Sequence, residues 1–193
     1  MKRVLLPLFC ICGFCLLITG CSELESRKQT AACSPDQGNA CIAEGTETES
    51  GFEPMTFDES IALFENKGSG ILYYGFKDCP WCVEAVPVLE EVRKEYDQTI
   101  HYIRTRDENR ERLYTDEQKE KIAPYLKDYM SENEEGILTL FVPCVVVVKD
   151  GQVVDGHVGT VEGHDAHERK MTAEEQEQLK KKYEDMLSGS ASH

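Results

Sequence analysis

The fold is decided by the stretch Ile71-Leu72-Tyr73-Tyr74-Gly75-Phe76-Lys77-Asp78-Cys79-Pro80-Trp81-Cys82. Residues 71–76 form a continuous apolar and aromatic run, which predicts a strand buried on both faces. After the cysteines, apolar residues recur every three or four positions, which predicts a helix that buries them. These positions are Val83, Val86, Leu89, Val92 and Tyr96. The two cysteines are therefore predicted to lie in the first turn of a helix, directly after a buried strand.

The segments on either side of this unit extend the pattern. Upstream, Thr56 and Glu59 have the spacing of a capping box and predict a short helix that stops at Gly68. Downstream, residues 100–104 predict a second strand. Two strands joined through a helix imply a parallel pair with a right-handed crossover.

The rest of the chain predicts two more helices and an antiparallel hairpin. Thr115 opens a capping-box pattern for a helix that reaches about residue 130 and is kinked or interrupted near Pro124. Strands over 142–148 and 152–158 are predicted to pair antiparallel about an Asp-Gly turn. A last helix is predicted over 172–187, again with a capping-box pattern at its start.

Two cysteines separated by two residues at a helix N-terminus have a definite chemical use. The unpaired N–H groups of the first turn and the helix dipole stabilise a thiolate, and they lower its pKa from about 8.5 to about 3.5–7.5. Cys79 is predicted to be the nucleophile that attacks a substrate disulfide, and Cys82 the thiol that resolves the mixed disulfide. In the reverse direction the oxidised pair would accept electrons from a substrate dithiol.

Zinc binding is the competing interpretation of a Cys-x-x-Cys motif. A structural zinc site needs four protein ligands, and the sequence has no second Cys-x-x-Cys motif and no pair of histidines at finger spacing. His164 and His167 are the only other candidates, and they stand in a charged segment that is typical of a solvated loop. The sequence therefore predicts a redox pair with no metal and no cofactor.

With these elements in order, the chain resembles the thioredoxin family over residues 56–187. The resemblance rests on the strand leading into Cys79-Pro80-Trp81-Cys82, on Pro87 in the following helix, on Val142-Pro143 before a strand, and on the Lys149-Asp150-Gly151 hairpin turn. It implies an α/β, thioredoxin-like fold, with a central mixed β-sheet flanked by helices on both faces.

The resemblance also implies a substrate-binding surface beside the cysteines. Pro143 would be cis and lie against the two sulfurs, while the backbone of Val142 would pair with an incoming substrate strand, and Trp81 would complete the surface. The alternative from sequence rules alone is an ordinary trans proline that begins a strand.

Two positions depart from the family pattern or add to it. Tyr73 stands where thioredoxins bury an acid, and we expect it to pack in the core, because a phenol is a poor base at neutral pH. Cys144 follows Pro143, and it is either a third thiol near the pair or a small buried hydrophobe, the interpretation we favour.

The N-terminus predicts export. Lys2 and Arg3 precede an apolar run over residues 4–18, and Ile18-Thr19-Gly20-Cys21 resembles a bacterial lipobox, in which Cys21 would be lipid-modified. An ordinary signal peptide or an uncleaved anchor is the alternative. We predict a lipoprotein signal peptide over residues 1–20, a flexible tether over 21–52 that is rich in polar residues, and one domain over 53–193.

Cysteine count and charge restrict the possibilities further. Of the nine cysteines, Cys33 and Cys41 are close enough to close a small disulfide loop in the tether. The formal net charge of −15 gives no electrostatic support for nucleic-acid binding.

Together these features predict a membrane-tethered, extracytoplasmic thiol-disulfide oxidoreductase, lipid-anchored at the cell membrane. Its partners would be exported, disulfide-containing proteins or peptides and a redox partner. The anchor, residues 76–82 and the acidic segment before Pro143 are similar to bacteriocin-transport accessory-type thioredoxin-like proteins. The alternative function is a non-catalytic binding module for an exported peptide. The direction of electron flow is left open by the sequence, because the Pro-Trp dipeptide does not fix the reduction potential.

Overall fold

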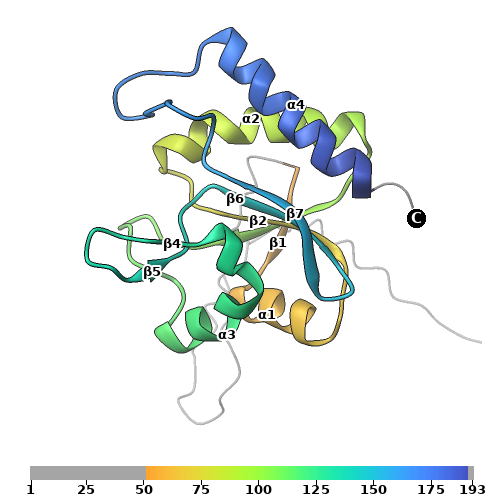
Figure 1. Cartoon of the computed structure of the whole chain (residues 1–193), viewed down its shortest axis with the longest axis vertical. Coiled ribbons are helices and arrows are strands. Elements are labelled where there is room, and N and C mark those ends of the chain that lie inside the picture. Colours follow the sequence, from red (N-terminus) through yellow and green to blue (C-terminus); the bar gives the residue numbers. More distant parts are fainter. Residues whose placement is uncertain (1–50, 191–193) are drawn as a thin grey trace, which may run out of the picture. The chain divides into compact units, whose positions relative to one another are not determined.

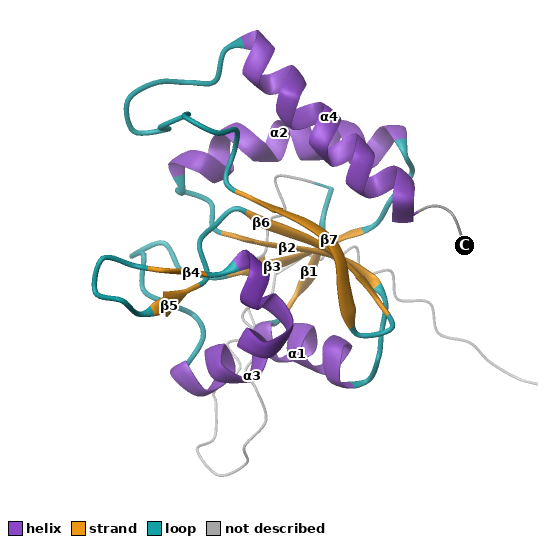
Figure 2. Ribbon diagram, in the orientation of Figure 1, coloured by secondary structure: helices purple, strands orange, loops and turns teal. Residues whose placement is uncertain are grey.

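The computed structural model describes residues 51–190, and its centre is a mixed five-stranded sheet in the order β1-β3-β2-β6-β7 (Figures 1 and 2). The strands are β1 (Glu53–Met55), β2 (Gly70–Gly75), β3 (Ile100–Arg104), β6 (Cys144–Lys149) and β7 (Gln152–Val158). β1, β3 and β2 run parallel to one another, whereas β6 runs antiparallel to both β2 and β7. β2 therefore occupies the centre of the sheet.

Four α-helices lie on the two faces of this sheet. They are α1 (Phe57–Glu65), α2 (Pro80–Glu95), α3 (Asp116–Leu126) and α4 (Ala173–Ser190). Helices α2 and α4 cover one face, while α1 and α3 cover the other (Figure 1). The predicted α/β class, with a central mixed sheet flanked by helices on both faces, is confirmed.

Alternation along β2 explains why its whole sequence is apolar. Ile71 and Tyr73 belong to the cluster of buried side chains under α2 and α4, whereas Leu72 and Tyr74 belong to the cluster on the α1 and α3 side. Successive side chains of a strand point to opposite faces of the sheet, so a strand covered on both sides needs no polar position. All four side chains are at most 3% exposed.

The local signals for starts and turns are confirmed. Thr56 and Thr115 accept hydrogen bonds from the N–H groups of Glu59 and Gln118, and both capping boxes are complete. In the β6–β7 turn, Asp150 and Gly151 have positive φ angles of 50° and 72°. A Cβ at Gly151 would overlap the backbone of α1 at Phe64, so glycine is required there by both conformation and space.

Other expectations about elements are wrong in detail. In α2 the buried residues are Cys82, Ala85, Val88, Leu89 and Val92, while Val83 is 56% exposed. The small side chains of Cys82 and Ala85 face the sheet, which rotates the buried stripe away from Val83. Helix α3 contains Pro124 and ends at Leu126, and a 3₁₀ turn (η1, Lys127–Tyr129) continues it.

Three short strands have no counterpart in the sequence prediction. β1 lies at the edge of the sheet against β3, and β4 (Ser131–Glu132) and β5 (Leu138–Thr139) form a small hairpin of their own. Two- and three-residue strands carry too little periodicity to be recognised. Phe52, at the predicted end of the tether, is 2% exposed and packs against Tyr73.

Most of the predictions for the N-terminal segment concern residues that the structure does not describe. The signal peptide, Cys21, the Cys33–Cys41 pair and the tether up to residue 50 lie outside the described residues. Within residues 51–190, none of the helices combines the length and the apolar character needed to cross a membrane.

Candidate active site

Cys79 lies at the point where the chain leaves β2 and enters α2. It is the N-cap residue of α2, with φ −77° and ψ 120°, and Pro80 follows as the first helical residue, a position that proline favours. The backbone N–H of Cys82 donates a hydrogen bond to the Cys79 Sγ, at 3.2 Å. The helix therefore uses the cysteine sulfur as its cap, which places the sulfur on the unpaired N–H groups of the first turn.

A second segment, distant in sequence, completes the immediate surroundings of Cys79. The Val142–Pro143 peptide bond is cis, and β6 begins directly after it. The Cys79 thiol donates to the carbonyl oxygen of Val142, with a sulfur–oxygen distance of 3.7 Å. β6 lies next to β2, with Cys144 opposite Tyr74, so sheet pairing holds the cis proline segment beside the helix N-terminus.

The two thiols have pKa values that are shifted in opposite directions. The pKa of Cys79 is lowered, mainly by its hydrogen bond with the Cys82 side chain and also by backbone N–H groups of the first turn and the charge of Arg110. The pKa of Cys82 is raised, mainly by burial and also by the hydrogen bond and charge of Cys79. Loss of the proton is therefore favoured at Cys79 relative to Cys82.

Tyr73 is the residue whose role sequence reasoning missed. It packs in the core as expected, with its ring stacked on Tyr102 at 5.2 Å, but its hydroxyl is also hydrogen-bonded to the Cys82 side chain. Burial raises the pKa of Tyr73 well above its usual value, so the hydroxyl stays protonated and can donate to the sulfur. A Cβ at Gly75 would overlap this hydroxyl, which shows that the glycine makes room for it.

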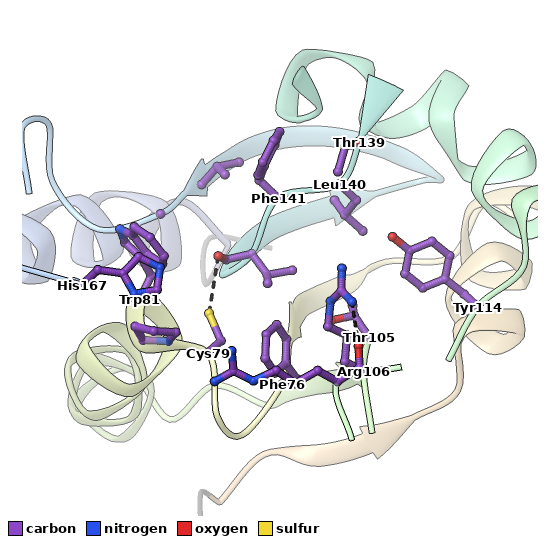
Figure 3. Close-up of a pocket in the computed structure, with 15 residues that line it drawn as sticks. Phe76, Cys79, Trp81, Thr105, Arg106, Tyr114, Thr139, Leu140, Phe141 and His167 are labelled. Carbon is purple, nitrogen blue, oxygen red and sulfur yellow. Dashed lines mark hydrogen bonds between the residues drawn. The ribbon is translucent and has the colours of Figure 1, made fainter. Parts of the chain in front are cut away.

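A cavity of about 660 Å³ opens beside Cys79 (Figure 3). Its lining residues are Phe76, Cys79, Pro80, Trp81, Thr105, Arg106, Arg110, Tyr114, Thr139, Leu140, Phe141, Val142, Val158, Gly159 and His167. Trp81 and His167 lie on one side of Cys79, while Arg106 and Tyr114 lie on the other side. The rings of Trp81 and His167 are in edge-to-face contact, with 4.7 Å between their centroids. The structure brings Cys79, Trp81 and Val142 together at this cavity.

Two other candidate residues of the sequence analysis take no part in this site. Cys144 lies on the opposite face of the sheet, and both ring nitrogens of His164 already have hydrogen-bond partners. Cys144 is fully buried on the α1 and α3 side of the sheet, where burial raises its pKa to about 12. The His164 ring is held between the Thr160 hydroxyl and the Arg169 carbonyl, at 2.7 and 3.0 Å. Among residues 51–190, no three His, Cys, Asp or Glu side chains gather as a metal site would require.

The arrangement now identifies the fold. Three parallel strands are extended by the antiparallel β6–β7 hairpin, Cys79 of the Cys-x-x-Cys motif caps the helix after the central strand, and the carbonyl oxygen of the cis Val142–Pro143 bond lies beside its sulfur. The fold is thioredoxin-like. No protein-family model and no curated protein sequence matches the chain.

Solved structures of thioredoxins are similar to this chain. A thioredoxin from Aeropyrum pernix is 25% identical, with 54% of this chain and 73% of that chain covered and a TM-score of 0.34. Desulfothioredoxin from Desulfovibrio vulgaris Hildenborough is 19% identical, with 67% and 95% covered and a TM-score of 0.37. Fasciola hepatica thioredoxin is 22% identical, with 56% and 86% covered and a TM-score of 0.33.

Proposed function

We propose that this protein is a thiol-disulfide oxidoreductase that acts through Cys79 and Cys82 on exported, disulfide-containing proteins or peptides. The observation that carries the proposal is the Cys79 sulfur at the N-cap of α2, which accepts the Cys82 N–H at 3.2 Å beside the cis Val142–Pro143 bond. The pKa values of the two thiols are separated in the direction that assigns attack to Cys79 and resolution to Cys82.

The exchange takes place in two steps. The Cys79 thiolate attacks one sulfur of the client disulfide, so that a Cys79–client disulfide forms and the other client sulfur leaves as a thiolate. Cys82 then loses its proton and attacks Cys79 Sγ, which forms the Cys79–Cys82 disulfide and releases the second client thiol. Two electrons pass to the client, and a dithiol donor must restore the pair. In the oxidative direction the steps reverse, and a disulfide acceptor restores it.

The cavity supports binding of an extended client segment at the sulfur. The Val142 backbone lies at the Cys79 thiol, and the apolar side chains of Trp81 and Phe141 flank it. Backbone groups beside a cis proline can pair with an incoming strand, while the side chains around it supply contacts. We therefore assign Trp81, Val142 and Pro143 to client binding.

A redox titration with a trapping variant tests the proposal. The wild-type protein should equilibrate with a dithiol/disulfide buffer as a two-electron couple, and Cys82→Ser should accumulate a client mixed disulfide on Cys79. Cys79→Ser should do neither. If Cys79→Ser/Cys82→Ser retains full activity in the cell, the protein is a non-catalytic binding module, and the oxidoreductase proposal is wrong.

The proposal includes attachment to the extracytoplasmic face of the cell membrane through a lipid on Cys21. Its support is the lipobox-like sequence and the preceding basic and apolar segments. The wild-type protein should fractionate with membranes and incorporate labelled fatty acid. Cys21→Ala should lose the label, and a wild-type chain that never acquires the label would contradict the assignment.

A further inference from the structure

The charged residues around Cys79 differ in sign from the rest of the protein. The chain has 36 Asp and Glu against 21 Lys and Arg, and its net charge is −15. None of the residues that line the cavity is Asp or Glu, whereas Arg106, Arg110 and His167 are among them. In a strongly acidic protein, the formally charged side chains that line the cavity beside the candidate nucleophile are thus the two arginines, Arg106 and Arg110.

Within residues 51–190, Arg106 and Arg110 differ from the other arginines in their ion pairs with carboxylates. Residues 51–190 contain six arginines, of which Arg93, Arg104, Arg112 and Arg169 form ion pairs with carboxylates at 2.6–2.9 Å. Arg106 and Arg110 have no carboxylate partner within this part of the chain. Among the six arginines of residues 51–190, the two without an ion pair are thus the two that line the cavity.

The loop itself holds these guanidinium groups at the cavity. Arg106 Nη1 donates to the carbonyl oxygen of Arg110 at 2.7 Å, and its guanidinium lies 5.8 Å from the centre of the Phe76 ring. Arg110 Nη2 lies 3.4 Å from the carbonyl oxygen of Asp78, next to Cys79. The nearby Asp107 carboxylate accepts the N–H groups of Asn109 and Glu111 instead of pairing with either arginine.

A guanidinium group has five donors, so a single backbone hydrogen bond leaves most of them available to a ligand. Arginine clusters recognise acidic peptide segments, because carboxylates can accept hydrogen bonds from the planar fork in pairs. Apolar side chains that include Phe141 and Trp81 line the remainder of the cavity and suit the neighbouring side chains of a peptide. Charge and shape together fit an extended peptide that carries a carboxylate.

We propose that Arg106 and Arg110 select clients that carry an acidic residue next to the reacting cysteine. This inference rests on the proposed oxidoreductase function and specifies its substrate class. A carboxylate beside the client cysteine would contact the arginine pair while the client sulfur lies at Cys79.

The test uses single turnovers of the pre-reduced protein, which need no external reductant. The substrates are short peptides with one cysteine joined to 2-thiopyridine through a disulfide, with Glu, Gln or Lys flanking the cysteine. Cys79 attacks the peptide sulfur, the Cys79–peptide disulfide forms, and 2-thiopyridone leaves and is measured by absorbance. Each rate is divided by the rate of the same peptide with free dithiothreitol, which removes differences in intrinsic reactivity.

The wild-type protein should prefer the Glu peptide over the Gln peptide by about three- to tenfold, as expected for one or two partly exposed ion pairs. The Lys peptide should be slower than the Gln peptide. The Arg106→Gln/Arg110→Gln variant should react with the Glu and Gln peptides at equal rates. Because Arg110 also helps to lower the pKa of Cys79, the Glu-to-Gln ratio within each variant is compared, and a changed thiolate fraction cancels.

Arg112→Gln is the matched control, because Arg112 is close in sequence but paired with Asp116 at 2.8 Å. It should keep the wild-type preference. A purely structural role of Arg106 and Arg110 in their loop would slow all peptides equally, so a preserved ratio in the double variant contradicts the proposal. A wild-type ratio of one also contradicts it.

Two further outcomes are informative. The mixed disulfide of glutathione and 2-thiopyridine is tested as an additional substrate. If the Arg106→Gln/Arg110→Gln variant reacts more slowly with this substrate but not with the peptides, the cavity binds a small thiol, and the acidic-peptide proposal is wrong. If the wild-type protein releases no thiopyridone from any peptide, the oxidoreductase function itself fails. Equal normalised rates of thiopyridone release from all the peptides would overturn only the proposed preference for acidic clients and would leave the oxidoreductase function standing.

Discussion

Cys79 and Cys82 are both at most 3% exposed, yet they differ in what surrounds their sulfurs. The Cys79 sulfur accepts a backbone N–H at the N-terminus of α2, whereas the Cys82 side chain is hydrogen-bonded to the buried hydroxyl of Tyr73. Burial penalises a thiolate at both positions, and hydrogen bonds to the charged form outweigh that penalty only at Cys79. The difference at the scale of single residues assigns the two chemical roles.

The first prediction concerns the pH dependence of alkylation. Because its pKa is lowered, Cys79 should react with iodoacetamide with a midpoint below the ordinary thiol value of about 8.5. Cys82, whose pKa is raised, should remain unreactive at that pH. Mass spectrometry of the reduced, folded protein at a series of pH values measures both. Cys144, with a pKa of about 12, is the internal control, and equal reactivity of Cys79 and Cys82 would contradict the assignment.

Tyr73→Phe tests the hydrogen bond to Cys82. Loss of the hydroxyl leaves the ring stacking in place but removes a donor that favours the Cys82 thiolate, so the resolving step should slow by about tenfold. Attack by Cys79 should be unchanged. Rapid acid quench and mass spectrometry give the lifetime of the mixed disulfide. An unchanged lifetime would show that Tyr73 serves only to pack the core.

At the scale of elements, the N-terminus of α2 joins catalysis to folding, because the candidate nucleophile is also the N-cap. The helix is held against α4 by apolar packing, and Lys180 bridges Glu91 and Glu95 at 2.7 and 2.9 Å. Glu84, in the second turn of α2, accepts the N–H of Met171 at 3.0 Å. These contacts fix the helix end relative to the segment that contains His167.

Substitutions of Cys79 separate its role as the N-cap of α2 from its role as the candidate nucleophile. Serine is a preferred N-cap residue, so Cys79→Ser should abolish exchange while leaving the free energy of unfolding of the reduced protein nearly unchanged at a pH below the folded pKa of Cys79, where both side chains are neutral. Cys79→Ala removes the acceptor for the Cys82 N–H and should cost about 1 kcal/mol. Urea unfolding of both variants under reducing conditions measures the difference. Equal stability of the two variants would argue against the capping role.

At the scale of the whole molecule, the thiol pKa values link stability to pH. Between the lowered pKa of folded Cys79 and about 8.5, the unfolded state binds more protons than the folded state, so stability rises with pH. This contribution is lost as the pH falls through the folded pKa. The raised pKa of Cys82 has the opposite effect above about 8.5, where the folded state binds more protons.

The measurable consequence is a difference between two proteins. The free energy of unfolding of the reduced wild type, minus that of Cys79→Ser, should increase with pH from the lowered pKa of folded Cys79 up to about pH 8.5 and then level off. Other titrating groups are common to both chains and largely cancel in the difference. Urea unfolding at several pH values provides it. A difference that is independent of pH would mean that Cys79 has an ordinary pKa in the folded protein.

The sequence by itself determined the features that depend on neighbouring residues. The buried strand, the capping boxes, the Asp-Gly turn and the placement of Cys79 at a helix start all follow from short patterns. The resemblance added the cis Val142–Pro143 bond and the sheet that holds it, and the structure has both. Each of these signals lies within a few consecutive residues or in a fixed order of elements.

Only the tertiary structure decided which side chains from distant segments meet at the sulfurs. The rotation of α2 exposed Val83 and buried Cys82, and it brought Cys82 to the Tyr73 hydroxyl. The loop after β3 placed Arg106 and Arg110 at the cavity without carboxylate partners in the described part of the chain. No local pattern encodes such contacts, because they depend on how elements pack and on which charges are already paired.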